Sequence, residues 1–137
     1  METGVVPVGN RIAILISSGD KACFDHALIK ACEFREMGRE VVIMIEGGAV
    51  AKIAEYTDGR VYLSQTYARI RDEGLIVGVC EVCARQYGVL EEAKKQKLPL
   101  IGSHPNVEAC RGRGYEVFAL VPKACSCCEA WDLKAEF

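Results

Sequence analysis

The chain has 137 residues, of which half are hydrophobic and 26% are charged. This length and balance are typical of one globular domain and exclude a disordered chain. The net charge of −2 provides no basic excess to attract nucleic acid, so we expect no nucleic-acid partner. No apolar run approaches the roughly 20 residues of a membrane span, and residues 1–7 lack a secretory pattern, so we expect a cytoplasmic protein with no membrane partner.

Strand-like and helix-like patterns alternate along the chain. A short apolar run at 11–18 predicts a buried strand, and apolar residues at helical spacing from Lys21 to Met37 predict a helix after it. Further strands are expected at 40–45, 75–79, 98–102 and 115–121, and further helices at 49–56, 63–73, 81–87, 90–97 and 105–111. This order predicts a single-domain α/β fold, with a mainly parallel five-stranded sheet and helices on both faces. We expect the domain to span residues 1–122 and a cysteine-rich tail to occupy 123–137.

The chain contains eight cysteines. In a reducing cytoplasm such a number favours metal binding, redox chemistry or sulfur chemistry over structural disulfides. The cysteines fall into three groups: the CxxC pair Cys80 and Cys83; the tail group Cys125, Cys127 and Cys128; and the isolated Cys23, Cys32 and Cys110, which we interpret as core or surface thiols. The first two groups are therefore the candidates for chemistry.

Strand polarity sorts the candidate sites, because ligands of open parallel sheets bind beyond the carboxyl ends of the strands. The loops expected at that edge are 17–20, 46–48, 80–83 and 103–106. Cys80 and His104 are therefore expected to share one edge of the sheet, although they are far apart in the sequence. The loop at 17–20 lacks the spacing of a phosphate-binding loop, so no nucleotide site is indicated there.

Cys80 is expected at a junction between a strand and a helix. A thiolate in that position faces free backbone N–H groups and the positive end of the helix dipole, which stabilise the charged sulfur. Cys83 lies one helical turn further on, where it is placed to resolve a persulfide or sulfenate on Cys80 as a disulfide. His104 is interpreted either as a base or hydrogen-bond donor for this chemistry or as a helix cap. The structural alternative is that both cysteines are small buried hydrophobic residues.

The tail cysteines allow three interpretations. They bind zinc or an iron–sulfur cluster together with Cys80 and Cys83, because soft thiolates select these metals. Alternatively, they form a thiol arm that shuttles sulfur or electrons, or they have no role. The 41 residues between Cys83 and Cys125 do not match a recognised zinc-finger spacing, so a shared metal site would require the tail to fold back.

Three stretches of the chain resemble the DsrE/DsrF-like family: IAIL followed by SGD at 12–20, MGREVVI at 37–43, and IVGVCEVCARQYGV at 76–89. In the last stretch a strand ends in a cysteine and runs into a helix that closes at a glycine, as in that family. The similarity covers residues 11–121 and implies a compact sheet with helices on both faces, assembled as a homotrimer or hexamer. It further implies that Cys80 carries sulfur as a persulfide in a sulfur-oxidation or tRNA-thiolation relay, with Cys83 matching the CxxC subset. The cysteine-rich tail departs from the plain family pattern.

These observations predict a sulfur carrier, sulfurtransferase-like if it is catalytic, that holds sulfane sulfur on Cys80 and passes it to a protein thiol. Its partners would be a sulfur donor, a sulfur acceptor and further copies of the same chain. One alternative is a metal- or iron–sulfur-binding protein that uses Cys80, Cys83 and tail cysteines. Another is a non-catalytic oligomer that binds a small ligand at the strand edge.

Overall fold

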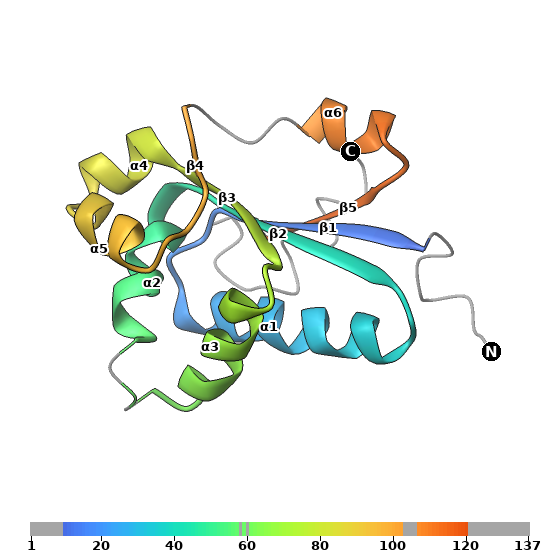
Figure 1. The fold of residues 1–137 in the computed structure, drawn as a ribbon, viewed down its shortest axis with the longest axis horizontal. Coiled ribbons are helices and arrows are strands. Elements are labelled where there is room, and N and C mark those ends of the chain that lie inside the picture. The colour runs from blue at the N-terminus through green and yellow to red at the C-terminus, as the bar shows by residue number, and fades with distance from the viewer. Residues whose placement is uncertain (1–9, 58, 60, 103–106, 121–137) are drawn as a thin grey trace.

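The structure is a computed structural model that describes residues 10–57, 59, 61–102 and 107–120. Strands and helices alternate along it, with one 3₁₀ helix, η1 (Figure 1). In chain order the elements are β1 (Arg11–Ile16), α1 (Lys21–Glu36), β2 (Glu40–Ile45), η1 (Gly47–Ala51), α2 (Lys52–Glu55), α3 (Ser64–Asp72), β3 (Ile76–Cys80), α4 (Glu81–Gln86), α5 (Leu90–Lys95), β4 (Leu100–Ile101), α6 (Val107–Gly112) and β5 (Glu116–Leu120).

The five strands form one sheet in the order β4-β3-β2-β1-β5, and every pairing among them is parallel. The predicted single-domain α/β fold is therefore confirmed. From β1 the chain moves outward through β2 and β3 to β4, and then returns to the other side of β1 as β5. The direction of winding thus reverses between β1 and β5, which is where ligands of such sheets commonly bind.

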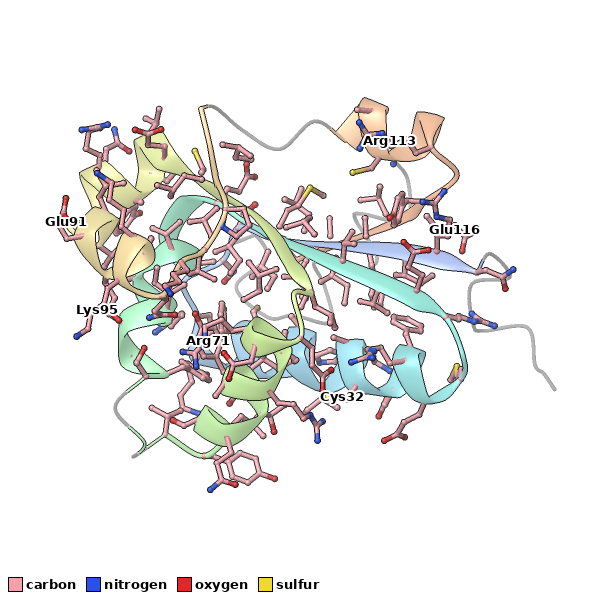
Figure 2. All side chains as sticks on the ribbon, viewed as in Figure 1. Cys32, Arg71, Glu91, Lys95, Arg113 and Glu116 are labelled. Carbon is pink, nitrogen blue, oxygen red and sulfur yellow. The ribbon has the colours of Figure 1, made fainter. Side chains whose placement is uncertain are left out.

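The two faces of the sheet are covered unequally. Alternate residues of β1, among them Ile12 and Ile14, join the larger core with the buried side of α1, where Phe24 is fully buried. Side chains fill the space between the sheet and α1 (Figure 2). The residues between them point to a smaller cluster around Met44, on the side of the sheet where α6 lies (Figure 1). There the thiol of Cys110 in α6 donates to Met44 Sδ at 3.8 Å. Helices therefore cover both faces, as the alternation of strands and helices predicts.

The strand near residue 100 is shorter than expected, with two residues in place of a run over 98–102. The residues just before β4 belong to the turn that ends α5. The N–H of Leu98 donates to the Ala93 carbonyl at 3.0 Å, and Lys97 adopts a left-handed backbone with φ of 62°. Pro99 has no N–H to add to the sheet, although its carbonyl accepts a bond from Val79.

The sequence pattern also does not predict a register shift in the pairing of β2 with β3. Ile43 pairs with Ile76 and Met44 pairs with Gly78, so Val77 has no partner in β2 and its side chain is 40% exposed. Beyond this shift Ile45 pairs with Val79, which brings the carboxyl ends of β2 and β3 level. Within the described ranges, no helix combines the length and apolar character that a membrane crossing requires.

Candidate functional site

The carboxyl ends of β1, β2 and β3 lie side by side in the sheet. Ile16 pairs with Ile45, and Ile45 pairs with Val79, so the loops at 17–20, 46–48 and 80–83 leave the sheet at one edge. Strand polarity alone predicts this arrangement. The fourth loop expected there, 103–106 with His104, lies outside the described residues.

The first two of these loops are in backbone contact, which requires glycine at several positions. A Cβ on Gly19 would lie 3.1 Å from the carbonyl oxygen of Gly48. Gly47 has φ of +56°, and a Cβ there would lie 2.9 Å from the carbonyl oxygen of Ser17. Ser17 Oγ also donates to Glu46 Oε2 at 2.6 Å. The two loops therefore form one rigid floor beside the end of β3.

Cys80 occupies the position predicted for it, at the end of β3 and immediately before α4, with an extended backbone at φ −65° and ψ 118°. Its side chain is fully buried within the larger core. The electrostatic support from α4 is smaller than expected, because the helix has only six residues and carries Glu81 in its first turn. The carboxylate of Glu81 is itself engaged by Arg85 at 2.6 Å.

Cys83 lies in α4 with only 6% of its side chain exposed. Burial is the main cause that raises the pKa of the Cys83 thiol, and a hydrogen bond from the Gly47 backbone opposes that rise. Three smaller effects raise the pKa further: the hydrogen bond between the two thiols, the charge of a Cys80 thiolate and the Glu46 carboxylate. The net direction is upward, so Cys83 keeps its proton at neutral pH. Its S–H is then available as a donor to the Cys80 sulfur, and both cysteines are free thiols.

Three side chains at this edge were not singled out by the sequence pattern. Glu46 and Ser17 are joined by their hydrogen bond, and the hydroxyl of Tyr87 lies 3.5 Å from the position that a Cβ on Gly48 would occupy. Tyr87 follows Cys83 by one helical turn, so the i, i+4 spacing was the signal that could have placed it on the same side of α4 as Cys83. Gly47-Gly48 at the end of a strand was the signal for a close backbone approach.

The tail cysteines Cys125, Cys127 and Cys128 lie outside the described residues, so the shared metal site stays a prediction. Among the residues that the structure describes, no group of three or more His, Cys, Asp or Glu side chains could hold a metal ion. A zinc or iron–sulfur site that uses Cys80 and Cys83 would therefore need further ligands from the remaining residues.

Alanine in place of Gly47 should disrupt this floor. Gly38 provides a matched control, because its φ of +84° is also left-handed but a Cβ there would meet nothing within 4 Å. We expect Gly38→Ala to lower the free energy of unfolding by about 1 kcal/mol, the cost of the backbone conformation. For Gly47→Ala, the clash with the Ser17 carbonyl should raise the loss to about 2–4 kcal/mol. Urea denaturation measures both, and equal losses would mean that the two loops are not in tight contact.

The raised pKa of Cys83 should appear in its alkylation by iodoacetamide, which attacks the thiolate. In unfolded protein the rate should level off above the ordinary thiol pKa of about 8.5. In folded protein the rate at Cys83 should still be rising at that pH, because burial disfavours the charged sulfur. Peptide mapping of pulse-labelled samples gives the profile for each cysteine. A folded-state profile at Cys83 that levels off at or below the unfolded one would contradict the interpretation.

Comparison with known proteins gives a relative and a structural neighbour, while no protein-family model matches the chain. The structural neighbour is BT1422 from Bacteroides thetaiotaomicron, described as a conserved protein of unknown function. It has a TM-score of 0.62 and 14% identity, over 80% of this chain and 94% of that chain. At that identity the likeness concerns the fold alone.

The relative is the uncharacterized protein MJ0733 of Methanocaldococcus jannaschii. It is 34% identical over 98 residues, which are 69% of this chain and 78% of MJ0733. The resemblance to the DsrE/DsrF-like family is a separate observation and stays a prediction. The extent and identity of the sequence match show that this chain belongs to the same family as MJ0733.

Proposed function

We propose that the chain is a sulfur carrier that holds sulfane sulfur as a persulfide on Cys80. The observation that supports this most directly is the contact between the thiols of Cys80 and Cys83 at the junction of β3 and α4. Cys83 holds its proton and hydrogen-bonds the side chain of Cys80, so the developing negative charge on the Cys80 sulfur has a donor beside it. The resemblance to the DsrE/DsrF-like family assigns the same role to Cys80.

The proposed chemistry is two thiol exchanges. In loading, the Cys80 thiolate attacks the outer sulfur of a donor persulfide, the donor S–S bond breaks, and the donor leaves as a thiolate while Cys80–S–SH forms. In unloading, the thiolate of an acceptor protein attacks that outer sulfur and Cys80 regains its thiolate. If Cys83 instead loses its proton and attacks the inner sulfur, a Cys80–Cys83 disulfide forms and hydrosulfide leaves.

Burial of Cys80 has two consequences for a carrier. A persulfide there would be shielded from small thiols, which discharge persulfides by the same exchange reaction. The fully buried side chain also means that donor and acceptor reach Cys80 only when the start of α4 moves. We therefore propose protein partners, which can bind the edge and stabilise such an opening, as the source and destination of the sulfur.

Assembly with further copies is part of the proposal, since the family resemblance implies a homotrimer or hexamer. Val82 and Tyr87 are large hydrophobic side chains that are 50% and 51% exposed, and both belong to the segment that follows Cys80. Exposed apolar groups beside a site are suited to a protein interface. They support an assembly or a partner that covers this edge.

Persulfide mapping tests the proposal. The full chain is reduced, incubated with inorganic polysulfide, alkylated and analysed by peptide mass. We expect one added sulfur on Cys80 in wild type together with some hydrosulfide release through Cys83. Cys83→Ser should retain the sulfur on Cys80 and release less hydrosulfide, because the resolving thiol is gone. Cys80→Ser should gain no sulfur at Cys83. If Cys80→Ser gains as much sulfur in this peptide as wild type, Cys80 is not the carrier.

A second candidate function is metal or iron–sulfur binding, and the position of β5 supports it. The N–H of Ser17 donates to the carbonyl of Leu120 at 2.8 Å, so β5 ends at the same edge as the cysteine pair. Three strand spacings, about 14 Å, separate the ends of β5 and β3. Cys125 follows Leu120 by five residues, which extend at most about 17 Å, so the covalent chain is long enough to join the sites.

Elemental analysis of the anaerobically purified full chain distinguishes the two candidates. For a metal protein we expect stoichiometric zinc or iron in wild type. The metal content should fall strongly in Cys80→Ser, and equally in a triple variant that combines Cys125→Ser, Cys127→Ser and Cys128→Ser, because the CxxC pair and the tail both supply ligands. For the sulfur carrier we expect only trace metal in all three proteins. Metal that is stoichiometric but unchanged by the tail substitutions would rule out the shared site.

A further inference from the structure

The boundary between α4 and η1 carries a tyrosine next to the cysteine pair. The N–H of Tyr87 donates to the carbonyl of Cys83 at 2.9 Å, so the two side chains leave the same side of α4 one helical turn apart. Both reach η1. The Cys83 thiol is hydrogen-bonded to the Gly47 backbone, and the Tyr87 hydroxyl lies 3.5 Å from the position that a Cβ on Gly48 would occupy. The two side chains therefore run beside each other to adjacent residues of one loop.

These two side chains lie at different depths. Cys83 is 6% exposed and Cys80 is fully buried, whereas Tyr87 is 51% exposed. The aromatic ring is therefore the outer layer of the boundary, and the thiol of Cys83 lies inside it. A reagent that approaches the cysteine pair along this boundary meets Tyr87 before it meets Cys83.

The backbone that carries the ring is fixed. The N–H of Gly88 donates to the Arg85 carbonyl at 3.2 Å, and the N–H of Val89 donates to the Ala84 carbonyl at 2.9 Å. Gly88 has φ of +71°, so these are the two hydrogen bonds of a Schellman motif at the end of α4. Rotation about the side-chain bonds of Tyr87 can therefore uncover the boundary while this end of the helix stays intact.

The far end of the α4–α5 segment is held by a separate set of hydrogen bonds. Gln96 follows α5, and its Oε1 accepts from the Tyr67 hydroxyl at 2.6 Å. Its Nε2 donates to the Ile53 carbonyl in α2 at 2.9 Å. These bonds tie the end of α5 to both α2 and α3. Movement that exposes the thiols is therefore expected at the α4 boundary and not by displacement of both helices together.

We propose that the Tyr87 ring controls access to the cysteine pair: in the observed position it covers Cys83, and its rotation admits reagents to that side of the pair. This inference rests on the proposed function for its biological meaning, since it assigns the regulation of sulfur exchange at the same site. With the ring in place, small thiols are kept from the pair. A protein partner that binds the ring in its rotated position stabilises the open site, because it binds that state more tightly than the closed one.

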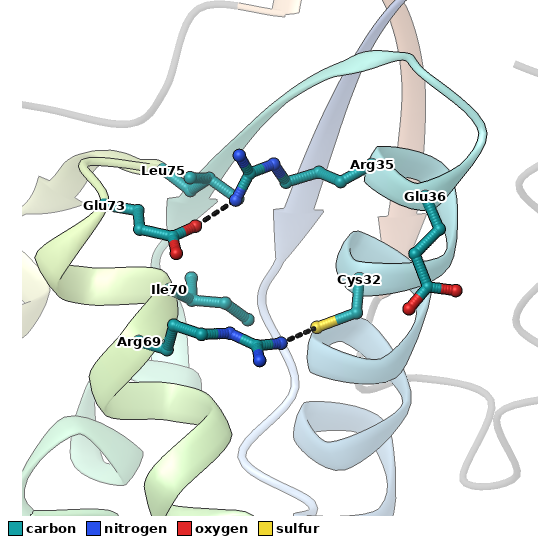
Figure 3. Close-up of a pocket in the computed structure, with 7 residues that line it drawn as sticks. All are labelled: Cys32, Arg35, Glu36, Arg69, Ile70, Glu73 and Leu75. Atoms are coloured by element: carbon teal, nitrogen blue, oxygen red, sulfur yellow. Dashed lines mark hydrogen bonds and ion pairs between the residues drawn. The ribbon is translucent and has the colours of Figure 1, made fainter.

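The test is alkylation of the reduced full chain by iodoacetamide, followed by peptide mass mapping. We expect Tyr87→Ala to speed alkylation of Cys83 by about tenfold, which corresponds to about 1.4 kcal/mol less free energy of local opening. Cys23, which is 3% exposed in α1, reports global unfolding. Cys32 is partly exposed in a separate cavity between α1 and α3 and reports direct reaction in the folded state (Figure 3). The rates at both reference cysteines should not change. An equal acceleration at Cys23 would assign the effect to lost stability and overturn the proposal.

Two further variants separate the ring from its hydroxyl and from the exposed surface of α4. Tyr87→Phe keeps the ring and should react at Cys83 like wild type. Val82→Ala removes a side chain that is 50% exposed in the same helix, and it should also leave the rate at Cys83 unchanged. If Tyr87→Phe reacts as fast as Tyr87→Ala, the ring is not the cover. If Val82→Ala accelerates Cys83 as much as Tyr87→Ala does, the protection belongs to the surface as a whole, and the role assigned to Tyr87 is wrong.

A second measurement links the ring to sulfur exchange and keeps the two proposals separable. After loading with inorganic polysulfide, sulfur on Cys80 should be discharged by glutathione faster in Tyr87→Ala than in wild type or Tyr87→Phe. If wild type takes up no sulfur on Cys80, the sulfur carrier fails, while the alkylation of Cys83 still decides the role of Tyr87. If sulfur is carried but neither its discharge nor the alkylation of Cys83 responds to Tyr87→Ala, the carrier stands and control by Tyr87 is refuted.

Discussion

The parallel register of β1, β2 and β3 is the constraint on which the cysteine site depends. It brings Ile16, Ile45 and Val79 level at one edge, so three loops from distant parts of the chain meet. Two of these loops are then held in backbone contact, because Gly47 and Gly48 leave no side chain between them and the first loop. Cys83 lies against this contact, and its hydrogen bond with the Gly47 backbone exists only when the loops are in place.

Much of this arrangement follows from patterns that the sequence displays. The apolar runs of β1 and β2 alternate with the helical spacing of α1, and strand polarity assigns their following loops to one edge. The short β4 and the register shift at Val77 do not follow, because each depends on a local competition. At β4 the turn that ends α5 extends over residues 96–98 and so removes Leu98 from the expected strand. At Val77 pairing with β2 resumes one residue later.

The chemical environment of the cysteine pair was predictable only in part. The position of Cys80 before a helix follows from the sequence, and the helix dipole was the expected source of thiolate stabilisation. The structure gives α4 six residues and an acidic first turn, so that source is weak. The structure adds a donor that the helix dipole does not account for, the thiol of Cys83, which burial keeps protonated. Burial depends on tertiary packing by α4, η1 and β3, and the CxxC spacing carries no information about it.

Cys80 and Cys32 differ in how far solvent reaches their sulfur atoms. Cys80 is enclosed by the core, with a neutral thiol as its donor, which suits retention of a labile sulfur and makes exchange depend on opening of the edge. Cys32 is partly exposed, and its sulfur accepts a hydrogen bond from the Arg69 guanidinium at 3.3 Å. A buried sulfur exchanges only when the structure around it opens, whereas a partly exposed sulfur meets solutes in the folded state. Retention and rapid access are therefore opposing requirements on a single sulfur, and the burial of Cys80 favours retention.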